Sequence, residues 1–254
     1  MRKLCFHIQK GGVGKTSVSG TIDASLARRG KKTVLIDADP QGNSSSWYCE
    51  ELVEHDIADV LTRRATLSQV IKPLSANLSV IPVVAIGGTL KEWSETKLTQ
   101  TPKAFEFLNA DLASLGFDYA VFDCSPSFSQ LERAVIAEVD EVINPLSPEF
   151  FSVDGIEIFL AELRAIEQSY RRKIQNDKIV LNMVNKSFAR HKEFCRVIEK
   201  LDYKVFIIPQ DSKIAECQIA RQNLYDFAPQ AKSLSYFESL TDALMKEREY
   251  VYGN

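Results

Sequence analysis

The segment that decides the fold follows the first apolar run of the chain and reads Lys10-Gly11-Gly12-Val13-Gly14-Lys15-Thr16-Ser17. A short apolar stretch, Leu4 to Gln9, precedes it, and a helix-compatible stretch, Lys15 to Arg29, follows at once. A strand, a glycine-rich turn and a helix in this order make a cradle for phosphate, because glycine lets backbone N–H groups wrap around the ligand and the helix N-terminus adds partial positive charge. The plainer interpretation is a turn with two solvated lysines, which the flanking strand and helix disfavour.

Every residue from Lys10 to Ser17 is therefore a candidate nucleotide-binding residue. Lys15 is placed to neutralise β- and γ-phosphate oxygens, and Thr16 offers its hydroxyl to Mg²⁺. The general phosphate-loop pattern, GxxxxGK[ST], requires glycine where this chain has Gln9, so the segment fits a deviant form with an additional lysine, Lys10. A lysine there can reach a nucleotide held by a second subunit, as an arginine finger does elsewhere. This predicts a dimer that encloses its nucleotides.

Composition is that of a soluble globular protein. The chain has 254 residues, of which 45% are hydrophobic and 26% charged, with a net charge of -3. We expect one domain over residues 1–254, and any contact with DNA must be a local basic patch. The apolar run at the start of the chain is too short for a signal segment, so we expect a cytoplasmic protein. The five cysteines show no CxxC spacing, so we expect reduced thiols.

Short apolar runs alternate with helical patterns along the whole chain. The expected strands are Leu4 to Gln9, Lys32 to Asp37, Leu78 to Pro82, Phe117 to Asp123, Glu141 to Leu146, Lys178 to Asn185 and Lys204 to Pro209. The expected helices are Lys15 to Arg29, Pro102 to Leu115, Gln130 to Val139, Phe151 to Ser169, Arg190 to Leu201 and Gln230 to Arg248. This order predicts an α/β fold with a mostly parallel, twisted sheet of about seven strands flanked by helices. We expect residues 42–46 to be a mobile loop.

Acidic residues stand where two predicted strands end. The second strand runs into Asp37-Ala38-Asp39-Pro40-Gln41-Gly42-Asn43, and the fourth ends at Asp123. Side chains alternate along extended backbone, so Asp37 and Asp39 can face the same way, one toward the hydration shell of Mg²⁺ and one toward an attacking water. Asp123 has the position of a Walker B aspartate, which holds Mg²⁺ through water. A turn-capping role is the alternative for Asp39 and for Asp123.

These segments together resemble the ParA/MinD group of deviant Walker A ATPases, and the DPQGN sequence favours its ParA/Soj branch. The likeness extends over nearly the whole chain through Asp123-Cys124-Ser125-Pro126, residues 77–82, residues 148–155 and residues 208–216. It departs from the family at Ser125, where a proline is usual, so the switch that follows Asp123 is expected to be looser. It departs again at Gly20-Thr21-Ile22, where we expect an effect on packing rather than on chemistry.

The resemblance implies an ATPase with ATP and Mg²⁺ as cofactors. Its catalytic candidates are Lys10, which contacts nucleotide across the dimer, Lys15, and Asp39, which positions the hydrolytic water. Its metal candidates are Thr16, Asp37 and Asp123, and its adenine candidates are Pro209 and Asp211. It also implies slow hydrolysis that is stimulated by a ParB-like centromere-binding protein or another partner.

ParA relatives bind DNA nonspecifically as ATP dimers through basic residues near the C-terminus. The candidates here are Lys186, Arg190, Lys192, Arg196, Lys200, Lys213 and Arg221, with Arg171-Arg172-Lys173 upstream. Lys192, Arg196 and Lys200 recur every four residues and share one helical face, as contact with a DNA backbone requires. A solvated face compensated by Glu193 and Glu199 is the alternative. DNA binding would make the protein nucleoid-associated in its ATP-bound state and place it in plasmid or chromosome segregation.

Other functions of the same group remain open. A MinD-like membrane or cargo-positioning ATPase needs a terminal amphipathic helix, and residues 246–254 are of mixed charge and weakly amphipathic, so we expect no membrane contact. An iron-sulfur reductase needs paired cysteines, and Cys124 has no evident second ligand. An ATP-dependent ligase would need a substrate pocket of its own, for which the chain shows no inserted segment.

Overall fold

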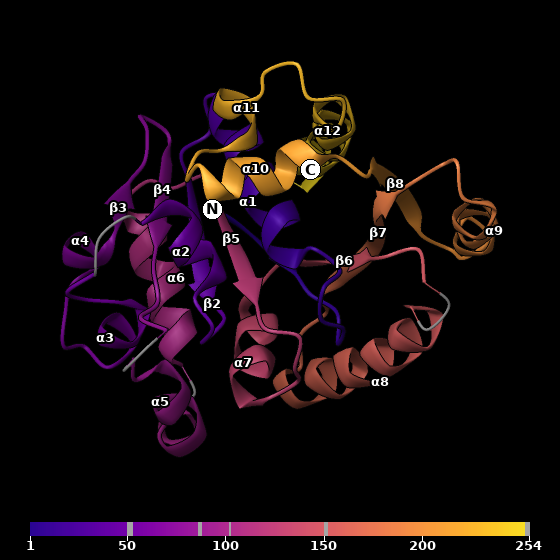
Figure 1. Cartoon of the computed structure of the whole chain (residues 1–254). Coiled ribbons are helices and arrows are strands. Elements are labelled where there is room, and N and C mark those ends of the chain that lie inside the picture. Colours follow the sequence, from indigo (N-terminus) through magenta and orange to yellow (C-terminus); the bar gives the residue numbers. More distant parts are fainter. Residues whose placement is uncertain (50–52, 86–87, 102, 150–151, 252–254) are drawn as a thin grey trace.

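An eight-stranded sheet forms the centre of the molecule, with the order β3-β4-β2-β5-β1-β6-β7-β8 (Figure 1). The computed structural model describes residues 1–49, 53–85, 88–101, 103–149 and 152–251. The strands are β1 Arg2–Phe6, β2 Thr33–Ala38, β3 Lys72–Pro73, β4 Leu78–Ile81, β5 Tyr119–Cys124, β6 Glu141–Leu146, β7 Gln175–Val184 and β8 Lys204–Pro209. Their pairings are parallel except for β3 with β4. The parallel sheet explains why most strands read as continuous apolar runs.

Helices cover both faces of the sheet, each over its own hydrophobic core. One face carries α3 Ile57–Leu61, α4 Leu67–Val70, α5 Leu90–Thr96, η1 Leu98–Gln100, α6 Ala104–Ser114, α7 Gln130–Glu138, α8 Ser152–Tyr170 and α9 Ala189–Ile198. The other carries α1 Lys15–Arg28, α2 Asn43–Tyr48, α10 Ser212–Ile219, α11 Leu224–Phe227 and α12 Leu234–Val251. None of the described helices is long and apolar enough to cross a membrane.

The predicted α/β sheet is confirmed, with β6 and β8 at their predicted bounds. The antiparallel edge strand β3 was not predicted, because two residues are too short to show alternation. The prediction of a mobile loop at residues 42–46 is wrong. Gly42 has a φ of 66°, and the helix α2 begins directly after it. The predicted helix starts at Pro102 and Phe151 lie outside the described residues.

Gly20 makes room for the indole of Trp47, which seats α2 on α1. A Cβ at Gly20 would lie 2.5 Å from Cζ3 of Trp47. The indole Nε1 in turn donates to the carbonyl of Gln222, 2.8 Å away, in the connection between α10 and α11. The departure from the family pattern at Gly20 therefore concerns packing, as predicted, and it fixes the helix that follows Asp39.

Gly20→Ala is expected to lower the free energy of unfolding by about 1–3 kcal/mol, because the added methyl group overpacks the contact with Trp47. Urea denaturation measures the change. Alanine is the better helix former by about 1 kcal/mol, so a stabilised variant would contradict the described contact. Adding Trp47→Leu to Gly20→Ala is the matched control, since the smaller side chain should return part of the lost stability.

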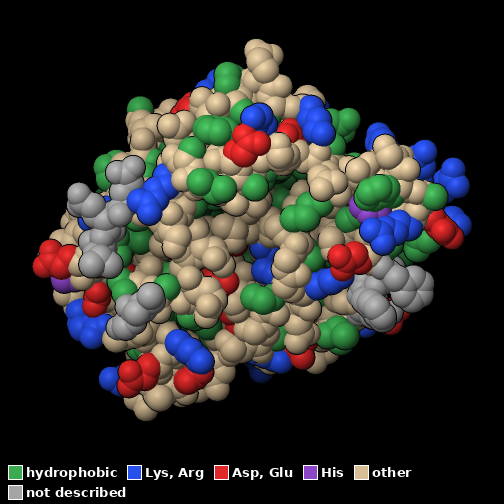
Figure 2. All heavy atoms as spheres, viewed as in Figure 1, with side chains coloured by type: hydrophobic (Ala, Val, Ile, Leu, Met, Phe, Trp, Pro, Cys, Tyr) green, Lys and Arg blue, Asp and Glu red, His purple; other side chains and the backbone are tan. Residues whose placement is uncertain are grey.

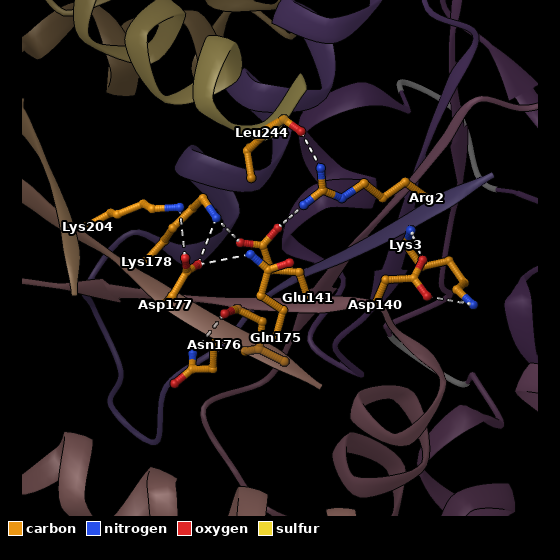
Figure 3. Close-up of polar contacts among 11 residues, drawn as sticks. Arg2, Lys3, Asp140, Glu141, Gln175, Asn176, Asp177, Lys178, Lys204 and Leu244 are labelled. Atoms are coloured by element: carbon orange, nitrogen blue, oxygen red, sulfur yellow. Dashed lines mark hydrogen bonds and ion pairs between the residues drawn. The ribbon is translucent and has the colours of Figure 1, made fainter. Parts of the chain in front are cut away.

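A buried ionic network lies at the amino edge of the sheet, opposite the phosphate loop (Figure 3). Glu141 and Lys178 are both fully buried, and the Nζ of Lys178 lies 2.7 Å from Oε1 of Glu141. Arg2 pairs with the second oxygen of Glu141 at 2.5 Å and also donates to the carbonyl of Leu244 in α12. Asp177 accepts from Lys178 at 2.8 Å. The network joins β1, β6, β7 and the last helix.

Candidate functional site

The phosphate loop connects β1 to α1, and two of its glycines have backbone angles in the left-handed region of φ/ψ space. Gly12 has a φ of 73° and Gly14 a φ of 84°, which side chains other than glycine rarely adopt. A Cβ at Gly14 would lie 2.2 Å from Nδ2 of Asn182, whereas a Cβ at Gly11 or Gly12 would meet no atom within 4 Å. The loop is thus packed against β7 on one side and open on the other, where phosphate would lie.

Lys15 is nearly buried beneath this loop, and its Nζ donates to the carbonyl of Lys10 at 2.7 Å. Burial lowers the pKa of Lys15, and the charges of Asp123 and Asp39 oppose that shift. A desolvated ammonium group close to two carboxylates is held in place for an anionic ligand.

Asp37 and Asp123 are paired residues at the carboxyl ends of the neighbouring strands β2 and β5. Asp37 Oδ2 accepts from the backbone N (2.7 Å) and Oγ (2.6 Å) of Ser45, and Asp123 Oδ2 accepts from Ser44 Oγ at 2.7 Å. Burial raises the pKa of both carboxyl groups, and the charge of Asp123 raises the pKa of Asp37 further. Two carboxylates held this close favour a divalent cation between them and the ligand.

The residues present fit Mg²⁺. Asp123 Oδ1 is buried without a hydrogen-bond partner in the described part of the chain, and the Thr16 hydroxyl is among the groups that lower the pKa of Asp123 against the effect of burial. No group of three or more His, Cys, Asp or Glu side chains among the described residues forms a ready-made metal site. Mg²⁺ does not need one, because it keeps several waters and binds through one or two carboxylates together with substrate phosphates.

Asp39 lies just beyond β2 and is 6% exposed. Its Oδ1 accepts from the backbone N of Gln41 at 2.9 Å. Burial is the main cause that raises the pKa of Asp39; the bond from Gln41 and the charge of Lys15 lower it, and Glu132 raises it. The structure therefore brings Asp39, Lys15 and Asp123 into one electrostatic cluster, as the sequence predicts.

Lys10 is held within its own subunit. Its Nζ lies 2.7 Å from Oε2 of Glu149, which follows β6 and is largely exposed. The hydrogen bond with Lys10 is the main cause that lowers the pKa of Glu149. Lys10 is thus at the loop entrance, as predicted, with its ammonium group directed to the β6 loop.

The adenine candidates lie at the end of β8. Pro209 pairs with Val184 of β7. Asp211 is the N-cap of α10, and its carboxylate accepts from the backbone N of Lys213 (3.1 Å) and from the backbone N (3.1 Å) and Oγ (3.0 Å) of Ser233. Both oxygens of Asp211 therefore have structural partners.

The sequence did not single out several residues of the site. Ser44 and Ser45 hold the two carboxylates, and Asn182 donates to the carbonyl of Val13 at 3.0 Å while its Oδ1 is buried without a partner in the described residues. The signal for Asn182 is a polar residue within the apolar run that ends β7, residues 179–184. The signal for the serines is a polar run directly after an acidic strand end.

The DNA candidates do not all share one surface. Arg190, Lys192 and Arg196 are on α9, Lys186 and Lys200 flank it, and Lys213 and Arg221 are on or after α10. Figure 2 shows Lys and Arg side chains at the side where Figure 1 places α9. Lys213 pairs with Glu216 at 2.6 Å.

Two of the three upstream cations are engaged in ion pairs. Arg172 pairs with Asp140 at 2.7 Å and Lys173 with Glu167 at 2.8 Å, just before β7 begins. In contrast, Lys192, Arg196 and Lys200 are exposed, and the structure shows no ion pair for them among the residues it describes. The alternative given above was a charged face compensated by Glu193 and Glu199. In the described part of the chain neither glutamate forms an ion pair with these cations.

Comparisons with known proteins agree with this geometry. The AAA domain family matches residues 1–176. An uncharacterised protein of Borreliella burgdorferi is 40% identical over 246 residues, covering 96% of this chain and 99% of the relative. The chromosome-partitioning ATPase Soj of Treponema pallidum is 30% identical, with 85% of each chain covered.

A solved structure has the same fold. The structure of a putative plasmid partition protein from Borrelia burgdorferi, bound to AMPPNP, aligns with a TM-score of 0.79 over 97% of this chain and 99% of that one, at 21% identity. Three findings agree. The site has a phosphate loop with paired acidic strand ends, a family model matches most of the chain, and its relatives include Soj proteins. The chain belongs to the ParA/Soj family of partitioning ATPases.

Proposed function

We propose that this chain is a DNA-partitioning switch that acts as a single domain over residues 1–254. It binds ATP and Mg²⁺, closes into a dimer around two nucleotides, binds DNA without sequence preference and is reset by slow, partner-stimulated hydrolysis. The observation that carries the proposal is the cluster of Lys15, Asp39, Asp37 and Asp123 around the open side of the phosphate loop. ATP-Mg²⁺ bound there would place γ-phosphate charge beside Lys15 and its water beside Asp39.

Dimer closure requires a change at Lys10. In the single chain its ammonium group is paired with Glu149 at 2.7 Å. The carboxylate is exposed, and an exposed pair of this kind contributes little to stability. Lys10 can therefore exchange Glu149 for the phosphates of a nucleotide in the second subunit at small cost.

The exposed cations around α9 are the proposed DNA surface. Lys192, Arg196 and Lys200 lie on the solvent face, while His191, Phe194, Cys195 and Ile198 are buried under the helix. Cations without protein partners are free to contact phosphates and release counterions. The protein would then be cytoplasmic and associated with the nucleoid in the ATP state.

Lys192→Glu combined with Arg196→Glu is expected to weaken ATP-dependent binding to duplex DNA of unrelated sequence. The affinity of the parent should fall with salt, and each lost phosphate contact should lower the salt slope by about one. Fluorescence anisotropy with ATP, ADP or no nucleotide across a salt series measures this.

The matched control is Lys91→Glu with Lys97→Glu, which makes the same change in net charge at and just beyond α5. DNA affinity should change little in that variant. Equal loss in both pairs would mean a general charge effect and no α9 surface. If the parent dimerises with ATP and binds no DNA, the partitioning surface is absent, and liposomes and protein cargo become the next ligands to test.

A further inference from the structure

Several residues of the loop that joins β5 to α7 donate hydrogen bonds to one buried carboxylate. Glu132 is 1% exposed. It accepts hydrogen bonds from Ser125 Oγ (2.5 Å), Ser127 Oγ (2.7 Å) and Ser129 Oγ (2.5 Å) and from the backbone N of Ser129 (2.9 Å). No Lys or Arg in the described part of the chain forms an ion pair with it. Its charge is therefore balanced by hydroxyl and amide donors.

Capping of α7 explains only part of this arrangement. Ser129 is the N-cap of α7, and its exchange of hydrogen bonds with Glu132 forms the capping box of the helix. The hydroxyls of Ser125 and Ser127 are not needed for a capping box. They bring the preceding loop to the same carboxylate.

That loop starts at the metal-site aspartate. Asp123 is the penultimate residue of β5, and Ser125 follows the strand directly. The bond between Ser125 and Glu132 thus fixes the backbone two residues after Asp123. The looser switch expected at Ser125 stays a prediction; in this structure the Ser125 hydroxyl is bonded to Glu132.

Two further observations concern this loop and its carboxylate. The charge of Glu132 is among the causes that raise the pKa of Asp39, so Glu132 acts on Asp39 electrostatically. The ring of Phe128, in the same loop, packs against His7 (4.7 Å between centroids) and Phe159 (5.7 Å). The loop is therefore held both by the hydrogen bonds to Glu132 and by the aromatic packing of Phe128.

We propose that Glu132 is a positioning residue for ATP hydrolysis, which acts through Ser125 to hold the loop after Asp123 in its productive place. The inference rests on the proposed nucleotide switch and adds a residue pair to it. Removing a residue that hydrogen-bonds to a metal-site group and orients it typically lowers activity by about 10- to 100-fold.

Three serine variants separate positioning from stability: Ser125→Ala and Ser129→Ala each remove one hydroxyl that bonds to Glu132, and Ser125→Thr keeps it. Ser125→Ala should lower the single-turnover rate of Mg-ATP hydrolysis by about 10-fold or more and leave the KM for ATP within about twofold. Ser125→Thr keeps a hydroxyl and should restore the rate. Ser129→Ala removes the cap, so it should lower the urea midpoint and leave the hydrolysis rate per folded molecule near that of the parent.

A double-mutant cycle tests the pair itself. Glu132→Ala should slow hydrolysis as Ser125→Ala does, and adding Ser125→Ala to it should slow hydrolysis little further, because both changes remove the same bond. Multiplicative effects, or a Ser125→Ala protein that hydrolyses at the parent rate, would overturn the proposal. If Glu132→Ala does not fold, the contrast of Ser125→Ala with Ser125→Thr decides alone. A parent protein without ATPase activity would instead refute the proposed function.

Discussion

Asp39→Ala is expected to lower the single-turnover rate of ATP hydrolysis by about 10²- to 10⁴-fold, the usual effect of losing a positioned acid–base group. Mg-ATP binding should survive, because Lys15, Thr16 and the paired Asp37 and Asp123 remain in place. The carboxylate of Asp39 is nearly buried, is held by the backbone of Gln41 and lies within the field of Lys15. By the proposed roles, its loss removes the group that would orient water and keeps the groups that would hold phosphate.

Calorimetry with ATP-Mg²⁺ and size-exclusion chromatography complete this experiment. The Asp39→Ala protein should bind ATP and accumulate as a dimer, since the step that resets it is blocked. Lys15→Ala is the matched control, and it should lose nucleotide binding because it removes the ammonium group that lies nearly buried beneath the loop. Hydrolysis at the parent rate in Asp39→Ala would show that another group orients the water.

The phosphate loop and the acidic strand ends could be predicted because their signals are local. Glycines at positive φ, a lysine and a threonine at the start of α1 and a carboxylate at the end of a buried strand each depend on neighbours in sequence. The strand order, with β2 beside β5, and the register of that pair then bring Asp37 beside Asp123, and only the structure shows both. The roles of these residues in binding and hydrolysis stay predictions until the variants are measured.

Residues that act across the sheet could not be predicted in this way. Asn182 reaches Val13 from a strand far along the chain, and Glu149 reaches Lys10 from the loop after β6. Glu132 looks like an ordinary first-turn acid in the sequence, and only the fold shows Ser125 and Ser127 turned toward it. Short helices such as α2 were missed because a run of asparagine and serine has low helix propensity, and burial of Ser44 and Ser45 overrides it.

Lys178→Met is expected to lower the free energy of unfolding by about 3–5 kcal/mol, the usual cost of removing one partner from a buried ion pair. The variant leaves Glu141 fully buried, with Arg2 still paired to it but without the ammonium group that lay 2.7 Å away. Urea denaturation measures the loss. A lower midpoint with an unchanged dependence of the unfolding free energy on urea concentration would show that stability itself has changed. Nucleotide binding by the folded fraction should persist, since Arg2 and Glu141 begin β1 and β6 at the amino edge of the sheet, whereas the phosphate loop follows the carboxyl end of β1.

Two companion variants separate the buried charge from lost packing. Lys178→Met with Glu141→Leu removes both charges, so it should recover much of the loss, as apolar replacements of whole buried pairs often do. Lys173→Met removes a cation that is 91% exposed in its pair with Glu167, and it should change stability by less than about 1 kcal/mol. If Lys178→Met cost no more than Lys173→Met, Arg2 would compensate Glu141 by itself, and the link between β6 and β7 would rest on apolar contacts rather than on the ionic network.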